Sequence, residues 1–215
     1  MTRQERSERT RRGLIQAAAE AFDANGFVRT RLSEISAGAG VSPGALHFHF
    51  ENKAAVADAV ERVARARLRC AARAALNQER GALQSLMDLS HAVAVLLTDD
   101  VVVRAGVRLN DDSDRPSGHD LHKDWQDLVE ALLLRAAEEG TLDTEVPTRC
   151  LTLVLVAACT GLEALGRSNP VWLSRSSVTT LWTLLLPRMV GPSALHAVDP
   201  AGRDGVIRSA VPFPA

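Results

Sequence analysis

The stretch from Thr30 to Lys53 restricts the possible folds of this chain more than any other part of the sequence. Its residues, TRLSEISAGAGVSPGALHFHFENK, predict two short helices joined by a tight turn. Leu32 and Ile35 give the first helix an apolar side, and the run Gly38-Ala39-Gly40 ends it, because glycine accepts the backbone angles of a helix C-terminus. A helix–turn–helix is therefore expected in the first quarter of the chain.

The second helix carries its own start signals. Ser42 is a natural N-cap, and Pro43 suits the first helical position, where its missing N–H costs no hydrogen bond. Val41 and Leu46 occupy the two positions of a hydrophobic staple. Leu46 and Phe50 are four residues apart, so they are expected to bury one face of this helix.

Small and polar residues remain on the outer, N-terminal side of the second helix. A helix–turn–helix that reads DNA lays this side in the major groove. Gly44 and Ala45 allow close approach, Ser42 and His47 are expected to contact bases or phosphates, and His49 and Lys53 to hold the backbone. The candidate DNA contacts are Thr30, Ser33, Ser42, Pro43, Gly44, Ala45, His47, His49 and Lys53.

These residues resemble the DNA-binding signature of the TetR family of bacterial repressors. In that family a capped helix, an A-G-V-S turn and a G-x-[LI]-x-x-[HY]-F-x-x-K run recur, and all three occur here without gaps. Two departures stand out. Arg31 occupies the position of the usual capping Thr, so that Thr30 is the alternative cap. Pro43 and His47 replace the Lys and Tyr that γ-butyrolactone receptors of actinomycetes usually carry.

The rest of the chain predicts an all-α fold. Nearly every segment has a 3.6-residue period, and no convincing alternating strand appears. A first helix is expected from Ser7 to Asn25, stopped by Gly26, and a long linking helix from Lys53 to about Gln78, capped by Asn52. The expected domains are a DNA-binding head at 1–52, a ligand-binding and dimerisation body at 53–190, and a mobile tail at 191–215.

Two helices near the end of the body are expected to form a subunit interface. The segment from Pro147 to about Leu165 is apolar nearly all round, which is typical of a helix covered on both sides. The segment from Val178 to Val190 repeats the pattern, and Trp182 is expected to pack there. A homodimer that joins these helices across a two-fold axis is the predicted assembly.

The segment R-A-G-V-R-L at 104–109, followed by Trp125, resembles the regulatory domain of the γ-butyrolactone receptors. The resemblance implies that Trp125 stacks on a lactone in a ligand pocket, whereas the residue pattern alone favours a core tryptophan. The Thr160 hydroxyl has two possible partners, a ligand carbonyl or the carbonyl four residues earlier. The candidate ligand-binding residues are Trp125, Thr160, Leu86, Ser90, Val107 and Arg104.

Other classes of function receive little support. The formal net charge is −1, so the DNA prediction depends on the motif and not on composition. The three cysteines have no metal-binding spacing, and no catalytic constellation is recognisable, so we expect no metal, no cofactor and no enzyme. The N-terminus lacks a signal peptide and no apolar run is long enough for a membrane span, so a cytoplasmic protein is expected.

Together these features predict a dimeric, ligand-responsive transcriptional repressor. It is expected to bind a pseudo-palindromic double-stranded operator, to be released by a small γ-butyrolactone-like signal, and so to control secondary metabolism, including antibiotic production. One alternative is a receptor-like repressor that answers to antibiotics or their intermediates. An alternative of another class is a helical small-molecule binder or enzyme that does not bind DNA.

Overall fold

The computed structural model describes residues 2–76, 81–112, 118–142 and 145–210, and these residues contain helices and no strand. The expected all-α class is confirmed. The chain forms two compact units, the first from residues 1–67 and 100–121 and the second from 68–99 and 122–215. The expected boundary after residue 52 therefore differs from the structural division. Residues 113–117 of the predicted loop and 211–215 of the predicted tail lie outside the described residues.

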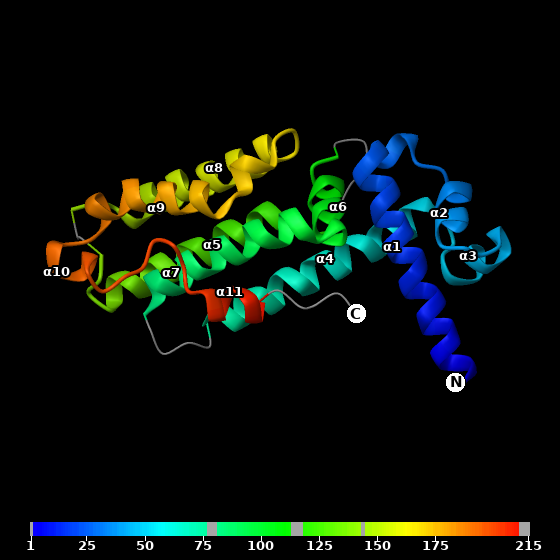
Figure 1. Ribbon diagram of the computed structural model, residues 1–215, viewed down its shortest axis with the longest axis horizontal. Helices are drawn as coiled ribbons and strands as arrows, with labels where there is room; N and C mark the ends of the chain where they lie inside the picture. Colours follow the sequence, from blue (N-terminus) through cyan, green and yellow to red (C-terminus); the bar gives the residue numbers. More distant parts are fainter. Residues whose placement is uncertain (1, 77–80, 113–117, 143–144, 211–215) are drawn as a thin grey trace. The chain divides into compact units, whose positions relative to one another are not determined.

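The first unit packs four helices and the start of a fifth around one apolar core. Its elements are α1 (Arg3–Arg29), α2 (Leu32–Gly38), α3 (Pro43–His49), the first turns of α4 (Lys53–Leu76) and α6 (Val101–Asn110) (Figure 1). The predicted apolar faces meet in this core, which contains Leu14, Phe22, Ile35, Leu46, Phe50, Val56, Val60 and Leu109. Because α2 and α3 bury one side each, their other sides remain available to a partner.

The first helix is longer than expected at both ends. It begins at Arg3, where the Thr2 side chain accepts a hydrogen bond from the Glu5 N–H and the Glu5 carboxylate accepts one from the Thr2 N–H. This capping box starts a helix well before the first apolar residue. Gly26 has a φ of 75°, so the regular helix stops there as predicted, and a further turn continues to Arg29 beyond the kink.

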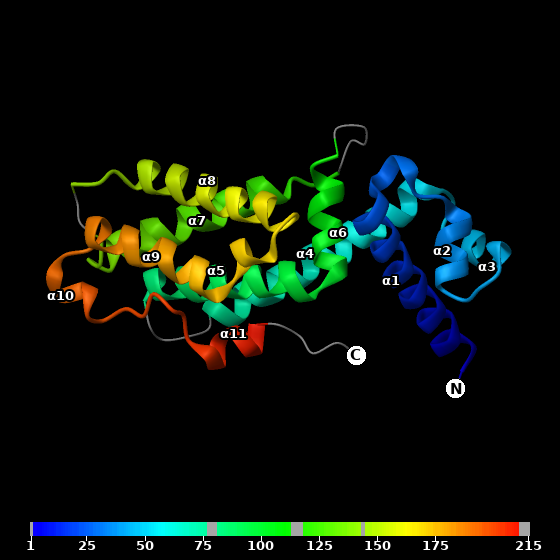
Figure 2. The ribbon, with the colours of Figure 1, turned by 45° about the horizontal axis from the view of Figure 1, so that its top comes forward.

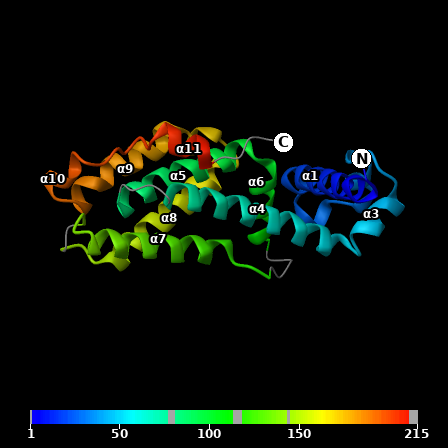
Figure 3. The same cartoon turned by 90° about the horizontal axis from the view of Figure 1, so that it is seen from below.

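The second unit is arranged around α5 (Ala82–Asp99), in which every residue from 82 to 92 is buried. Figure 3 shows α5 between α9 (Arg175–Met189) on one side and α7 (Leu121–Glu138) on the other. Figures 1 and 2 show α8 (Thr148–Gly166) and α9 on the outer side of this unit, connected through η1 (Pro170–Leu173). The fully covered helix is thus α5, whereas α8 keeps an exposed face.

Residues 191–210 are not the structureless tail that their proline and glycine content predicts. They include the short helices α10 (Pro192–Leu195) and α11 (Asp204–Ala210), and α11 packs on α5 through buried Val206 and Ile207. The Asp88 carboxylate, fully buried on α5, accepts hydrogen bonds from the Arg203 backbone N–H at 2.8 Å and from its guanidinium. This pairing attaches the C-terminal segment to the centre of the unit.

His91 lies beneath the same C-terminal segment. Its Nε2 is 2.9 Å from the Pro200 carbonyl oxygen, and the side chain is 2% exposed. Burial lowers the pKa of His91, with the Pro200 hydrogen bond opposing that shift. The neutral imidazole is therefore the form that fits between α5 and this segment.

Candidate functional site

The turn between α2 and α3 has the geometry that a helix–turn–helix requires. Gly40 has a φ of 66°, a left-handed conformation that glycine adopts without a Cβ penalty. The Gly40 N–H donates to the Ala37 carbonyl and the Val41 N–H to the Ser36 carbonyl, both at 3.0 Å. This pair of bonds is a Schellman motif, which closes α2 and directs the chain into α3.

The predicted start of α3 is confirmed. The Ser42 Oγ accepts a hydrogen bond from the Ala45 N–H at 3.2 Å, and Pro43 occupies the first helical position. Val41 packs against the core that contains Leu46, as the staple predicts. The sequence therefore determines both the position and the exposed side of α3.

The outer side of α3 presents most of the predicted DNA contacts to solvent. Ser33 on α2 and Ser42, Pro43, Gly44 and His47 are exposed, whereas Ala45 and His49 are half-buried. A Cβ built on Gly44 meets only the Ser42 Oγ, at 3.9 Å. Nothing within the protein itself requires glycine at this position, so a larger side chain there would act on a bound partner and not on the fold.

Phe48 is a surface residue of α3 that the sequence prediction omitted. Its side chain is 77% exposed, and its ring lies edge-on to that of His49, with centroids 5.2 Å apart. The signal was present in the sequence, because an aromatic residue between Leu46 and Phe50 cannot share their buried face. Phe48 therefore joins His47 as a side chain available to a partner.

Thr30 was predicted to contact DNA, but its side chain is buried. The residue is 1% exposed, and its hydroxyl donates to the Gly26 carbonyl at 2.8 Å. It does not cap α2 either. The N-cap position belongs to Arg31, whose backbone N–H donates to the Glu34 carboxylate at 3.1 Å. Thr30 instead stabilises the end of α1, where carbonyls lack helical partners.

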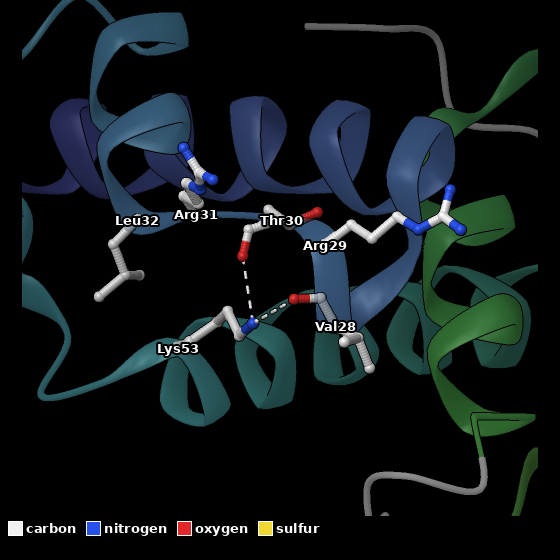
Figure 4. Close-up of a pocket in the computed structure, with 6 residues that line it drawn as sticks. All are labelled: Val28, Arg29, Thr30, Arg31, Leu32 and Lys53. Atoms are coloured by element: carbon white, nitrogen blue, oxygen red, sulfur yellow. Dashed lines mark hydrogen bonds between the residues drawn. The ribbon is translucent and has the colours of Figure 1, made fainter.

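Lys53 was likewise predicted to grip DNA phosphates, and its ammonium group is already occupied. The Nζ donates to the carbonyl oxygens of Phe27, Val28 and Thr30 at 2.8, 3.2 and 3.1 Å. Figure 4 shows the bonds to Val28 and Thr30. It also lies 4.5 Å from the centroid of the Phe27 ring. Because an ammonium has three donors, all of them are used within the protein.

An open surface groove surrounds this lysine. It has a volume of about 710 Å³ and is lined by Val28, Arg29, Thr30, Arg31, Leu32 and Lys53 (Figure 4). None of the predicted ligand-binding residues lines it. The groove is therefore a feature of the first unit, at the junction of α1 and α2.

Trp125 is the predicted ligand residue with the clearest unused capacity for hydrogen bonding. It lies on α7 in the second unit, and its indole Nε1 is buried with no hydrogen-bond partner among the described residues. A buried N–H without a partner costs free energy, and native proteins rarely retain one. An acceptor atom of a bound ligand would remove that cost.

Three further predicted ligand residues also belong to the second unit. Leu86 on α5 is buried in the core, and Thr160 on α8 is half-buried. Ser90 on α5 is committed elsewhere, since its hydroxyl donates to the Met87 carbonyl and accepts from the Trp182 Nε1, each at 2.7 Å. Trp182 is therefore a core residue of the protomer, 1% exposed, and not the interface residue that the sequence suggested.

The thiol of Cys159, the neighbour of Thr160 on α8, is unreactive. Burial raises the pKa of its thiol to about 12, so the thiol is protonated at neutral pH and is not a nucleophile. In the part of the chain that the structure describes, no cluster of three or more His, Cys, Asp or Glu side chains could hold a metal ion.

Arg104 and Val107, also predicted to bind the ligand, belong to the first unit. Both lie on α6, which belongs to the first unit and packs against α1. The Arg104 Nε donates to the Asp23 carboxylate at 2.9 Å, and Arg108 donates to the Asp23 carbonyl. Arg104 thus joins α6 to α1 in an ion pair, which replaces its predicted contact with a ligand.

Apolar side chains are exposed along α8, η1 and α9. The most exposed are Leu153 and Leu184, each at 71%, and the others are Val154, Leu165, Val171 and Trp172. Within the described residues, α8 is also the one helix long and apolar enough to cross a membrane by length and composition, which is weak evidence by itself. Such a surface needs a cover, and either lipid or protein would serve.

Comparison with known proteins identifies the class of this molecule. The sequence signature of bacterial regulatory proteins of the tetR family matches residues 14–60, and that of the tetracyclin repressor-like C-terminal domain matches residues 80–191. The chain is also 30% identical to the A-factor receptor protein of Streptomyces griseus over 204 residues, which are 94% of this chain and 72% of that protein. The chain belongs to the TetR family.

Solved structures of TetR proteins agree with this assignment over nearly the whole chain. A γ-butyrolactone receptor, described as an ArpA-like protein, has a TM-score of 0.78 at 28% identity and covers 95% of this chain and 96% of its own. CprB from Streptomyces coelicolor, solved with its biological operator sequence, has a TM-score of 0.73 at 29% identity and covers 89% and 93%.

The TetR assignment decides between the functional classes that the sequence left open. This TetR protein is a ligand-responsive repressor with a helix–turn–helix DNA-binding domain, and it is not an enzyme. TetR repressors are soluble proteins that bind operator DNA as dimers and also bind small molecules. The exposed apolar surface of α8 and α9 is therefore a candidate for the contact between two copies of the chain.

Proposed function

We propose that this repressor responds to a small γ-butyrolactone-like molecule and, through it, controls secondary metabolism, including antibiotic production, in the cytoplasm. The observation that carries the proposal is the buried, unpartnered indole N–H of Trp125. A lactone has a carbonyl oxygen that can accept this hydrogen bond, and its flat ring can stack on the indole. Similar proteins named as an A-factor receptor and as γ-butyrolactone receptors support the same ligand class.

The operator follows from the head and from two-fold symmetry. Two copies of α3 reach successive major grooves when the half-sites lie about one helical turn apart, ~34–36 Å, so the operator is a pseudo-palindrome. Ser33, Ser42, Pro43, Gly44, Ala45, His47 and His49 make the contacts. Lys53 and Thr30 have an indirect role, because they hold the end of α1 against α4.

Release from DNA requires a difference in ligand affinity between two forms. The ligand must have a higher affinity for the form that does not bind the operator. By linkage, the operator must then weaken ligand binding by the same factor. The helix α4 continues from the first unit into the second, so it is the element through which a change at Trp125 reaches the head.

The test is operator binding in the presence of a panel of synthetic γ-butyrolactones, measured by gel shift with an inverted-repeat duplex from DNA upstream of the gene. Trp125→Phe keeps an aromatic ring and removes the N–H. We expect unchanged operator affinity and an inducer requirement raised by about tenfold, the equivalent of one lost hydrogen bond of about 1.4 kcal/mol.

Trp182→Phe is the matched control, because its N–H donates to Ser90 inside the core. It should lower stability by about 1 kcal/mol and leave the response of the folded protein unchanged. A normal response of Trp125→Phe would show that Trp125 is not in the ligand site. Release by an antibiotic, but by no lactone of the panel, would show that the ligand class is wrong.

A further inference from the structure

We propose that the first three turns of α1, residues 3–13, form a second DNA-contacting surface that binds the phosphate backbone beside the helix–turn–helix. This surface, called the arginine arm below, contains Arg3, Arg6, Arg9, Arg11 and Arg12 against only Glu5 and Glu8. The proposal rests on the operator binding described above and adds a contact outside residues 14–60, the part that matches the TetR signature.

The arginines of the arm are exposed, apart from Arg11, which is half-buried. Leu14 is the first buried residue of α1, and residues 2–13 include no aliphatic, aromatic or sulfur-containing side chain. Figure 1 shows these turns of α1 extending past α2 and α3. The capping box at Thr2 and Glu5 starts this part of α1, which continues without a break into the buried turns from Leu14 onward.

Four guanidinium groups of the arm have no hydrogen-bond or ion-pair partner among the residues that the structure describes. Arg3, Arg6, Arg9 and Arg12 are exposed, and none forms a hydrogen bond or ion pair with another described residue. They follow one another at spacings of three, at which like charges on a helix repel. The arm's acids are used locally, Glu5 at the Thr2 N–H and Glu8 by the Gln4 amide. An external anion would offset this repulsion.

The fifth arginine connects the arm to the DNA-reading helix. The Arg11 guanidinium lies 5.3 Å from the centroid of the Phe50 ring, and Phe50 is the C-cap residue of α3. This cation–π contact places the root of the arm beside the end of α3. DNA bound by α3 would therefore meet a series of unpaired arginines on the same unit.

The chemistry of the arm selects a phosphate backbone over a protein or a membrane. Protein interfaces and amphipathic membrane helices need apolar side chains at their centre, and the arm has none. Guanidinium groups bind phosphate oxygens through paired, charge-assisted hydrogen bonds. Such contacts add affinity that is independent of sequence and sensitive to salt.

The experiment compares the wild type with a triple variant of the full chain, Arg3→Gln, Arg6→Gln and Arg9→Gln. Dissociation constants for the operator duplex and for a scrambled duplex are measured by fluorescence anisotropy between about 50 and 200 mM salt. Each lost phosphate contact should make the negative slope of log K against log salt shallower by about 0.9. The two arms of a dimer should therefore make it shallower by about 2 to 5 in total. We expect the affinity for both duplexes to fall by about tenfold or more.

The matched control removes the same charge elsewhere. Arg69, Arg73 and Arg208 are exposed residues of the second unit, and their replacement by Gln should leave the salt slope unchanged. Replacement of Arg3, Arg6 and Arg9 by Lys should retain most of the slope, because the positive charge is kept. Thermal unfolding verifies that all variants are folded.

Two results would overturn the proposal: an unchanged slope in the Gln variant of the arm, or an equal loss in the control. Either would make the arm a solvated helix end. The Gly44→Asp variant tests the helix–turn–helix separately, since it should abolish operator binding at any salt concentration. If the wild type binds and Gly44→Asp does not, the repressor function stands whatever the arm variants show.

Discussion

The ammonium group of Lys53 replaces solvent at the C-terminal end of α1. The last carbonyls of a helix have no partner within that helix, and a positive charge there also offsets the helix dipole. Lys53 satisfies three of these oxygens at once and connects the first turn of α4 to the end of α1. The position of α1, and with it the core under α3, therefore depends on one long side chain.

Replacing Lys53 with Met should cost roughly 2–3 kcal/mol, because a chain of similar length then leaves carbonyls at the helix end without their charged donor. The measurement is the free energy of unfolding in urea. Lys123→Met is the control, since the ion pair between Lys123 and Asp127 is exposed, and it should change stability by less than about 0.5 kcal/mol.

The same variant distinguishes the structural role of Lys53 from a phosphate contact. A phosphate contact predicts normal stability and a salt slope of operator binding that falls by about 0.9 per head. A structural role predicts lower stability and a slope that stays the same for the folded protein. Normal stability with a changed slope would support the phosphate contact predicted from the sequence.

At the scale of helices, α4 and α6 approach each other unusually closely within the first unit. A Cβ on Gly106 of α6 would lie 2.3 Å from the Ala64 Cβ of α4, which is far inside van der Waals contact. Arg67 on α4 forms an ion pair with Asp100, the N-cap of α6, near the same contact. The two helices are therefore held together by shape and by charge.

Gly106→Ala should destabilise the protein by about 1–3 kcal/mol, because the added methyl group has no space and α4 must move away from α6. Gly13→Ala is the control. It also places a methyl group on a helix, but nothing lies within 4 Å, so it should stabilise by about 0.5–1 kcal/mol through helix propensity. Urea denaturation measures both, and a neutral Gly106→Ala would refute the close contact.

The helices that were predicted well have local signals. Asn52 caps α4 by accepting from the Ala55 N–H at 2.9 Å, and Gly26 takes the positive φ expected of a glycine that stops a helix. Caps and periodicity act within a few residues, so one sequence is enough to read them. The start of α1 at Arg3 differs from the predicted start at Ser7, because apolar periodicity does not extend to the first turns, although Thr2 and Glu5 show the capping-box spacing.

The features that were missed depend on contacts between distant residues. Asp88 and Arg203 are 115 residues apart, and their pairing decides that residues 191–210 pack on α5. The partners of Lys53, Arg104 and Ser90 are likewise 23 to 92 residues away. The face of α3 could be predicted because its motif is contiguous, whereas the ligand residues depend on how separate helices pack.

At the scale of the whole molecule, the apolar surface of α8, η1 and α9 is the feature that a single chain leaves incomplete. We expect two copies to join there in a four-helix packing, so that Leu153 and Leu184 become buried. One head alone binds only one half-site, and joining two heads raises the apparent affinity for a two-site operator by orders of magnitude. Operator binding should therefore depend on residues far from α3.

The double variant Leu153→Glu and Leu184→Glu should be monomeric, because charges buried in an apolar interface without partners are strongly unfavourable. Light scattering after size-exclusion chromatography measures the mass, and anisotropy measures an operator affinity expected to fall by 100-fold or more, on the order of the avidity of linked sites. Val28→Glu is the control, since Val28 is an exposed apolar residue of the first unit, at 63%, and should leave the dimer intact. A double variant that remains dimeric would place the subunit interface elsewhere and leave the exposed face of α8 to another partner.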